Sequence, residues 1–115
     1  MRFRAQTMEH FELHALLAQR PAGHNYFELI RIPAMSAGLY VLQADEPDRQ
    51  LPHREDELYY VLSGRATIRV GAEERLVMPG TVVYVPGGVQ HGFHSITEEL
   101  QVLVVFAPAE TAAPS

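Results

Sequence analysis

Short apolar runs separated by compact turn signals fill the chain from residue 58 to residue 106, and they constrain its fold more than any other feature. The runs are rich in branched and aromatic residues, as β-strands are, and the turns include Ser63-Gly64, Gly71-Ala72 and Pro79-Gly80. The predicted strands here are 58–62, 66–70, 75–78, 82–85, 91–96 and 100–106. Many short strands at close intervals predict a closed antiparallel architecture, because closure removes exposed sheet edges.

One short helix and two further strands are predicted before this region. Residues 8–18 carry apolar side chains at helical spacing, and Thr7 precedes them as a favourable N-cap residue. Pro21 ends this segment, and residues 26–32 and 38–42 then have the composition of strands. The sequence therefore predicts an all-β fold, a small antiparallel β-barrel or jelly roll, with one short N-terminal α-helix.

The chain length leaves room for a single domain. A chain of 115 residues builds one hydrophobic core. We expect an N-terminal helical arm over residues 1–25 and the β-barrel over residues 26–106. Residues 107–115 show no core-forming pattern, so we expect a loose C-terminal tail there.

Composition excludes several classes of site and partner. The net charge is −5 and the nine basic residues, all of them arginine, are scattered, which argues against nucleic-acid binding. The chain has no cysteine, so disulfides, thiolate metal sites and a cysteine nucleophile are excluded. Because no apolar stretch has the length of a signal peptide or a membrane span, we expect a cytoplasmic protein without a membrane partner.

A cluster of polar residues lies where a strand is predicted to begin. His53, Glu55 and Glu57 share one strand parity, so they project from the same face, and Tyr59 follows in that parity. Inside a barrel these groups need a compensating partner such as a divalent cation. If the stretch is still loop, the three are merely solvated polar residues, and this segment alone leaves both interpretations open.

A second histidine opens a later predicted strand. A buried strand ends in the turn Pro86-Gly87-Gly88, and His91 begins the next strand, which places its imidazole at a barrel mouth. Two histidines and one carboxylate then converge, a donor set that suits iron, manganese, zinc or nickel. The sequence thus predicts one divalent metal ion on His53, His91 and either Glu57 or Glu55.

These residues resemble the two motifs of the cupin superfamily over roughly residues 39–106. The first motif is similar to His-x-His, three or four residues, Glu, six residues and Gly. The second is similar to Gly, five residues, Pro-x-Gly, two residues, His, three residues and Asn. The positions in register are His53, Glu57, Gly64, Gly80, Pro86, Gly88 and His91. The spacing to Gly64 favours Glu57 over Glu55 as the carboxylate of the family site.

The chain departs from these motifs at two positions. Leu51 stands at the first motif histidine and Ser95 at the closing asparagine, so the family set of three histidines and one glutamate is incomplete. Three ligands still hold a metal with open positions for water or substrate. Leu51 would make the cavity drier, and we expect Tyr59, Tyr84 and Phe93 to line the substrate pocket with it.

The resemblance to cupins implies a small-molecule site inside the barrel. Our leading hypothesis is a metal-dependent enzyme acting on a small oxygen-rich organic molecule, such as a dioxygenase, with Glu55 handling protons beside the ligands. An isomerase or epimerase is an alternative within the same superfamily, because fold does not fix function. A sensor or storage module that binds without conversion, and a metal-free barrel with hydrogen-bonded histidines, are the alternatives from other classes. Small cupins commonly pair, so we expect a homodimer built on residues 26–32 and the N-terminal helix.

Overall fold

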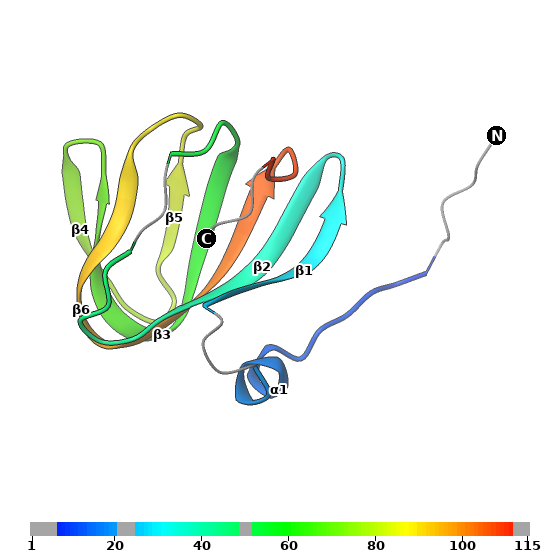
Figure 1. Cartoon of the computed structure of the whole chain (residues 1–115), viewed down its shortest axis with the longest axis horizontal. Coiled ribbons are helices and arrows are strands. Elements are labelled where there is room, and N and C mark those ends of the chain that lie inside the picture. Colours follow the sequence, from blue (N-terminus) through cyan, green and yellow to red (C-terminus); the bar gives the residue numbers. More distant parts are fainter. Residues whose placement is uncertain (1–6, 21–24, 49–51, 112–115) are drawn as a thin grey trace.

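The computed structural model describes residues 7–20, 25–48 and 52–111, and within them the chain forms one helix and six strands (Figure 1). Their bounds are α1 Leu13–Ala18, β1 Tyr26–Ile32, β2 Met35–Leu42, β3 Asp56–Val70, β4 Glu73–Val77, β5 Val82–Val85 and β6 His91–Ala107. The predicted all-β architecture with one short N-terminal helix is confirmed, but among the described strands β1 and β4 do not pair, so the sheet is not closed as predicted. Among the described residues, no helix has both the length and the apolar character needed to cross a membrane.

All strand pairs are antiparallel and belong to one sheet with the order β1-β2-β6-β3-β4. One edge of β3 pairs with β6 from Asp56 to Val70, and the other edge pairs with β5 near its start and with β4 near its end. Both β3 and β6 bend near their middle, so the sheet folds back on itself and its two halves face each other (Figure 1). The main core lies between these halves.

The bend corrects one detail of the sequence prediction. The sequence predicts a turn at Ser63-Gly64, but in the structure this dipeptide is an irregularity of the β3–β6 pairing inside a strand of 15 residues. Gly64 has φ +97°, and a Cβ atom there would lie 2.1 Å from the carbonyl oxygen of Glu99. Because only glycine permits this approach, two predicted short strands merge into one bent strand.

The helix is shorter than predicted. It spans six residues rather than residues 8–18, and it begins after Glu12, whose side chain makes no capping hydrogen bond. Met8 is 85% exposed, so the first predicted turn has no surface to pack against. Leu17 is buried and packs with Leu39 of β2. A helix this short depends on such packing, because its own hydrogen bonds do not offset the cost of nucleation.

Strand parity decides which side chains of β3 are buried. Tyr59 and Val61 are fully buried, whereas Leu58 and Tyr60 are 39% and 40% exposed. The buried members of the main core are Tyr40, Leu42, Tyr59, Val61, Ala66, Ile68, Val77, Val85, Phe93, Ile96, Leu100, Val102, Val104 and Phe106. The inward face of the bent sheet therefore supplies the main apolar burial of the domain.

The C-terminal segment differs from the predicted loose tail. β6 extends to Ala107, and Glu110 beyond it is 1% exposed. The backbone N–H of Glu110 donates to Oγ of Ser36 over 3.0 Å, and Nη1 of Arg31 donates to its carbonyl oxygen over 2.7 Å. These contacts to the β1–β2 hairpin fix the segment, although its own sequence has no apolar periodicity. Residues 112–115 lie outside the described residues.

Candidate metal centre

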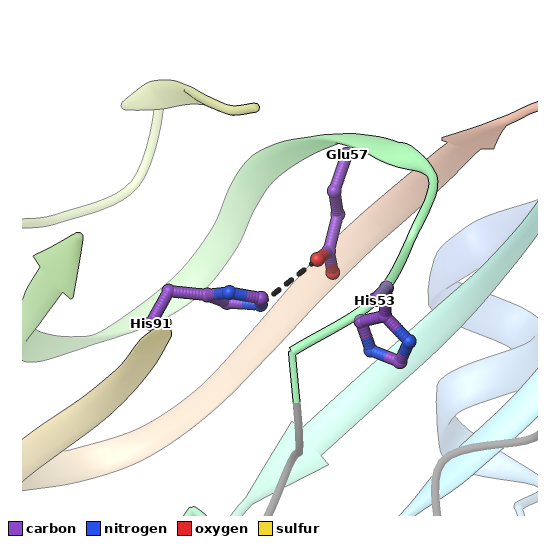
Figure 2. A group of neighbouring side chains, drawn as sticks. All are labelled: His53, Glu57 and His91. Atoms are coloured by element: carbon purple, nitrogen blue, oxygen red, sulfur yellow. Dashed lines mark ion pairs between the residues drawn. The ribbon is translucent and has the colours of Figure 1, made fainter. Parts of the chain in front are cut away.

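Three side chains predicted as metal ligands meet inside the fold. His53 lies just before β3, Glu57 is on β3 and His91 is the first residue of β6; one ligand atom from each lies within 4.8 Å of the others (Figure 2). In the strand register His91 pairs with Val70, at the far end of β3 from Glu57. A flat sheet would keep these residues apart, so the bend in β3 and β6 brings them together.

The tautomer of His91 is set by a backbone neighbour. Nδ1 of His91 lies 2.8 Å from the carbonyl oxygen of Val89, which can only accept a hydrogen bond. Nδ1 therefore carries the proton, and in the neutral ring Nε2 presents a lone pair. This Nε2 lies 2.9 Å from Oε1 of Glu57 (Figure 2).

Two electron-rich groups thus face each other in the interior. The side chains of His91 and Glu57 are 2% and 1% exposed. Nε2 of His91 and both carboxylate oxygens of Glu57 lack a hydrogen-bond partner of suitable geometry, which is costly for buried atoms. A divalent cation between them would satisfy both groups, and imidazole with carboxylate suits iron, manganese, zinc or nickel. The residues present therefore fit a metal ion.

A proton competes for the same position. Burial by itself lowers the pKa of His91, but the Glu57 carboxylate and the Val89 carbonyl oxygen outweigh burial and raise the pKa above its ordinary value. The pair therefore attracts positive charge, either as a proton between Nε2 and Oε1 or as a metal ion. The proton corresponds to the metal-free alternative, and variants of Glu57 separate the two.

The turn before β6 packs against the segment that carries His53. The backbone N–H of Gly88 donates to the carbonyl oxygen of His53 over 2.6 Å, and that of Gly87 donates to Oδ1 of Asp56 over 2.8 Å. A Cβ atom on Gly87 would lie 2.2 Å from the carbonyl oxygen of Arg54. The glycines after Pro86 therefore let the two ligand-bearing segments touch.

Glu55 is buried as well, but it does not join the three ligand candidates. It is 4% exposed, and its Oε2 accepts a hydrogen bond from Oγ1 of Thr111 over 3.2 Å. The group whose ligand atoms converge contains Glu57 instead. Strand parity allowed either Glu55 or Glu57 as the carboxylate ligand, and in the structure Glu57 is the one that lies with the two histidines.

The four residues expected to line the pocket take different places. Tyr59 and Phe93 are buried, and the Tyr59 ring centroid lies 6.1 Å from that of His91 and 4.9 Å from that of Phe93. Tyr84 is 58% exposed because it has the parity of the outer face of β5. It lines an open, mainly apolar cavity of about 850 Å³ beside β4 and β5, which the three ligand candidates do not line. Leu51 lies outside the described residues.

Two polar side chains near the centre were missed in the sequence analysis. The hydroxyl of Tyr26 and both carboxylate oxygens of Glu110 are buried without a hydrogen-bond partner. Burial, followed by the charge of Glu57, raises the pKa of Glu110 to about 7. Burial, followed by the charge of Glu110, also raises the pKa of Tyr26. A hint in the sequence was the lone acid among small apolar residues after the last strand.

Comparison with known proteins agrees with this fold. Residues 38–106 match the family described as Cupin domain. An uncharacterised protein of Streptomyces coelicolor is 51% identical over 105 residues, which cover 90% of this chain and 100% of that protein. The crystal structure of a Thermus thermophilus protein matches with a TM-score of 0.73 at 29% identity, over 89% of this chain and 99% of that chain. An RmlC-like cupin of Shewanella frigidimarina matches with a TM-score of 0.71 at 21% identity, over 91% and 96% of the two chains. The chain therefore belongs to the cupin family.

Proposed function

We propose that this cupin binds one divalent metal ion through His53, Glu57 and His91 and acts with it on a small oxygen-rich organic molecule inside the barrel. The observation that carries the proposal is the buried Glu57–His91 pair, whose facing atoms lack hydrogen-bond partners. Nδ1 of His91 donates to the carbonyl oxygen of Val89, so Nε2 is the nitrogen left to bind a metal. A bound divalent ion supplies Lewis acidity, which polarises an enol or carbonyl oxygen or activates a water.

The surrounding side chains would hold the ligands and exclude water. Tyr59 and Phe93 are 0% and 3% exposed, and Tyr59 packs beside the His91 ring. Phe106 packs edge-on against the His53 ring, with centroids 5.0 Å apart. Electrostatic interactions with a substrate oxygen are stronger in such a water-poor site. Such a site would suit a dioxygenase, an isomerase or an epimerase in which a substrate oxygen binds beside the metal.

Metal content tests the ligand assignment. The purified full chain is stripped of metal and loaded separately with Fe²⁺, Mn²⁺, Ni²⁺ or Zn²⁺, and elemental analysis follows. We expect about one ion per chain for at least one metal, and a large loss in His53→Ala and in His91→Ala. His94→Ala is the matched control, because the His94 side chain is 45% exposed and pairs with Glu74. Equal metal content in wild type and His53→Ala would remove His53 from the site.

Turnover separates an enzyme from a binding protein. Each metal-loaded form is incubated with diketones, catechols and sugar acids while oxygen consumption and product formation are followed. The proposal expects conversion of at least one class with one metal, and His91→Ala should abolish it. Tight binding of a compound without conversion under any metal would reject the enzyme.

Binding without conversion is the second candidate, and the enclosure of the centre favours it. The side chains of His53, Glu57 and His91 are 10%, 1% and 2% exposed. Exchange of substrate and product would require such a centre to open, whereas a sensor or storage module has no need for fast exchange. The same substrate panel distinguishes the two candidates.

A homodimer stays a prediction for this chain. β1 forms one edge of the sheet, and the outer face around β3 and β5 exposes Leu58, Tyr60, Val82 and Tyr84. Both features support contact with a second copy. Size-exclusion chromatography with light scattering should give twice the mass of one chain. A single-chain mass throughout the micromolar range would contradict the prediction.

A further inference from the structure

We propose that Glu110 is the positioning residue of His53: its carboxylate accepts the Nδ1 proton of His53 and so turns Nε2 of that ring toward the shared metal position. The part concerning the metal rests on the function proposed above. The part concerning the tautomer of His53 can be tested in the metal-free protein.

The backbone around Glu110 is fixed from two sides. Its N–H donates to Oγ of Ser36, which is 0% exposed, and its carbonyl oxygen accepts from Nη1 of Arg31. The next residue, Thr111, donates from its hydroxyl to Glu55. These contacts tie the C-terminal segment to β1, to β2 and to the segment before β3. The side chain of Glu110 is therefore held in the interior by its own backbone contacts.

The carboxylate of Glu110 lies beside the ring that it would orient. Its Oε2 is 3.8 Å from Nδ1 of His53, and the side chains are 1% and 10% exposed. Neither carboxylate oxygen has a hydrogen-bond partner. A buried carboxylate without a partner is costly. The proposal requires one of the two side chains to rotate so that these atoms reach the ~2.8 Å of a charge-assisted hydrogen bond.

The two histidines then become equivalent in chemistry. His91 already has its Nδ1 proton held by the carbonyl oxygen of Val89 and its Nε2 facing Glu57. With Glu110 on Nδ1 of His53, both rings offer Nε2 to one ion. Carboxylates that orient a ligating imidazole in this way fix its tautomer and raise its basicity. Glu57 and Glu110 together would also balance the two charges of a divalent cation.

Nitrogen-15 NMR of the histidine rings tests the tautomer without any metal. The full chain is labelled at histidine and studied metal-free at pH 8, and His53→Asn assigns the His53 signals. The proposal expects the Nδ1–H tautomer of His53 in wild type and in Glu110→Gln, whose amide oxygen still accepts. In Glu110→Leu we expect a shift to the Nε2–H tautomer. An Nε2–H tautomer in wild type would overturn the proposal whether or not Glu110→Leu folds.

Metal affinity provides the second readout, with Zn²⁺ alone as the probe. Glu110→Leu should weaken Zn²⁺ binding by about 10- to 100-fold, and Glu110→Gln should weaken it less. Glu98→Gln is the matched control, because the Glu98 side chain is 63% exposed. Equal losses in Glu110→Gln and Glu110→Leu would make Glu110 a direct ligand and overturn the positioning role. If wild type binds none of the four metals, the proposed function fails, while the NMR result still decides the tautomer.

Discussion

The inward face of β3 has two chemically different halves. Near its start, Glu57 faces His91, and the buried side-chain atoms without hydrogen-bond partners in the described part of the chain belong to these two residues, Tyr26 and Glu110. Beyond the bend, the same face carries Ala66 and contributes only apolar side chains to the core. Strand parity buries both halves equally. The apolar half stabilises the fold, whereas the buried polar pair costs stability unless a cation or a proton lies between its facing atoms.

The largest effect is expected in the apolar core to which the half of β3 beyond the bend contributes. Leu100 on β6 is 0% exposed and belongs to the main core. Leu100→Ala should lower the free energy of unfolding by about 2–5 kcal/mol, because it removes buried methyl groups and leaves a cavity. Urea denaturation with and without metal measures this. Metal affinity at a temperature where the variant is folded should stay near the wild-type value, and a parallel loss of affinity would show that the two halves are not independent.

A substitution in the polar half should raise the free energy of unfolding instead of lowering it. In Glu57→Gln the side-chain amide can donate to the Nε2 lone pair of His91, which replaces two facing electron-rich groups by a neutral hydrogen bond. We expect the free energy of unfolding of the metal-free variant to be about 1 kcal/mol higher than that of metal-free wild type. We also expect the variant to bind much less metal than wild type. Denaturation in the presence of a chelator, together with elemental analysis, measures both effects.

The stability of Glu57→Gln also shows whether a metal ion or a proton lies between His91 and Glu57 in wild type. If His91 and Glu57 form a protonated ion pair, removal of the carboxylate leaves a buried imidazole without its counter-charge. The metal-free protein would then become less stable rather than more stable. Such a result, together with an unchanged metal content, would show that Glu57 and His91 form a structural ion pair rather than a metal site.

The sequence identified the residues that lie together at the candidate centre better than it predicted the path of the chain. Strand parity and motif spacing selected His53, Glu57 and His91, because both signals depend on residues close together in the chain. A Ser-Gly pair, however, has the same composition in a hairpin turn as at an irregularity inside a strand, so the bend at Gly64 could not be distinguished from a turn.

Contacts between distant segments explain the remaining differences. Glu110 is fixed by Ser36 and Arg31, which lie far from it in the sequence, and no local pattern around Glu110 reports that contact. Tyr84 fits the composition of a pocket residue, yet its parity on β5 places it on the outer face. Burial of such residues depends on how strands pair, which composition alone does not determine.

The smallest effect is expected at a partly exposed contact beside the bend between the two halves, where the end of the helical segment meets β6. Nη2 of Arg20 lies 2.9 Å from Oε1 of Glu99, and the amide groups of Gln43 and Gln101 also donate to this carboxylate. Burial by itself raises the pKa of Glu99, but the hydrogen bonds from these amides and the charge of Arg20 outweigh burial and lower the pKa below its ordinary value of 4.5.

Glu99→Gln should therefore destabilise the protein in a pH-dependent way. A lowered pKa in the folded state means that the contact stabilises the fold above the ordinary pKa and that this stability is lost as the pH falls through the lowered value. At pH 7 we expect a loss of roughly 0.5–1 kcal/mol of unfolding free energy, because the carboxylate is partly exposed and screened. Denaturant titrations between pH 7 and pH 3 should show the gap to wild type closing at the acid end, while Glu98→Gln shows little change throughout. A gap that stays constant down to pH 3 would mean that Glu99 acts through packing rather than through its charge.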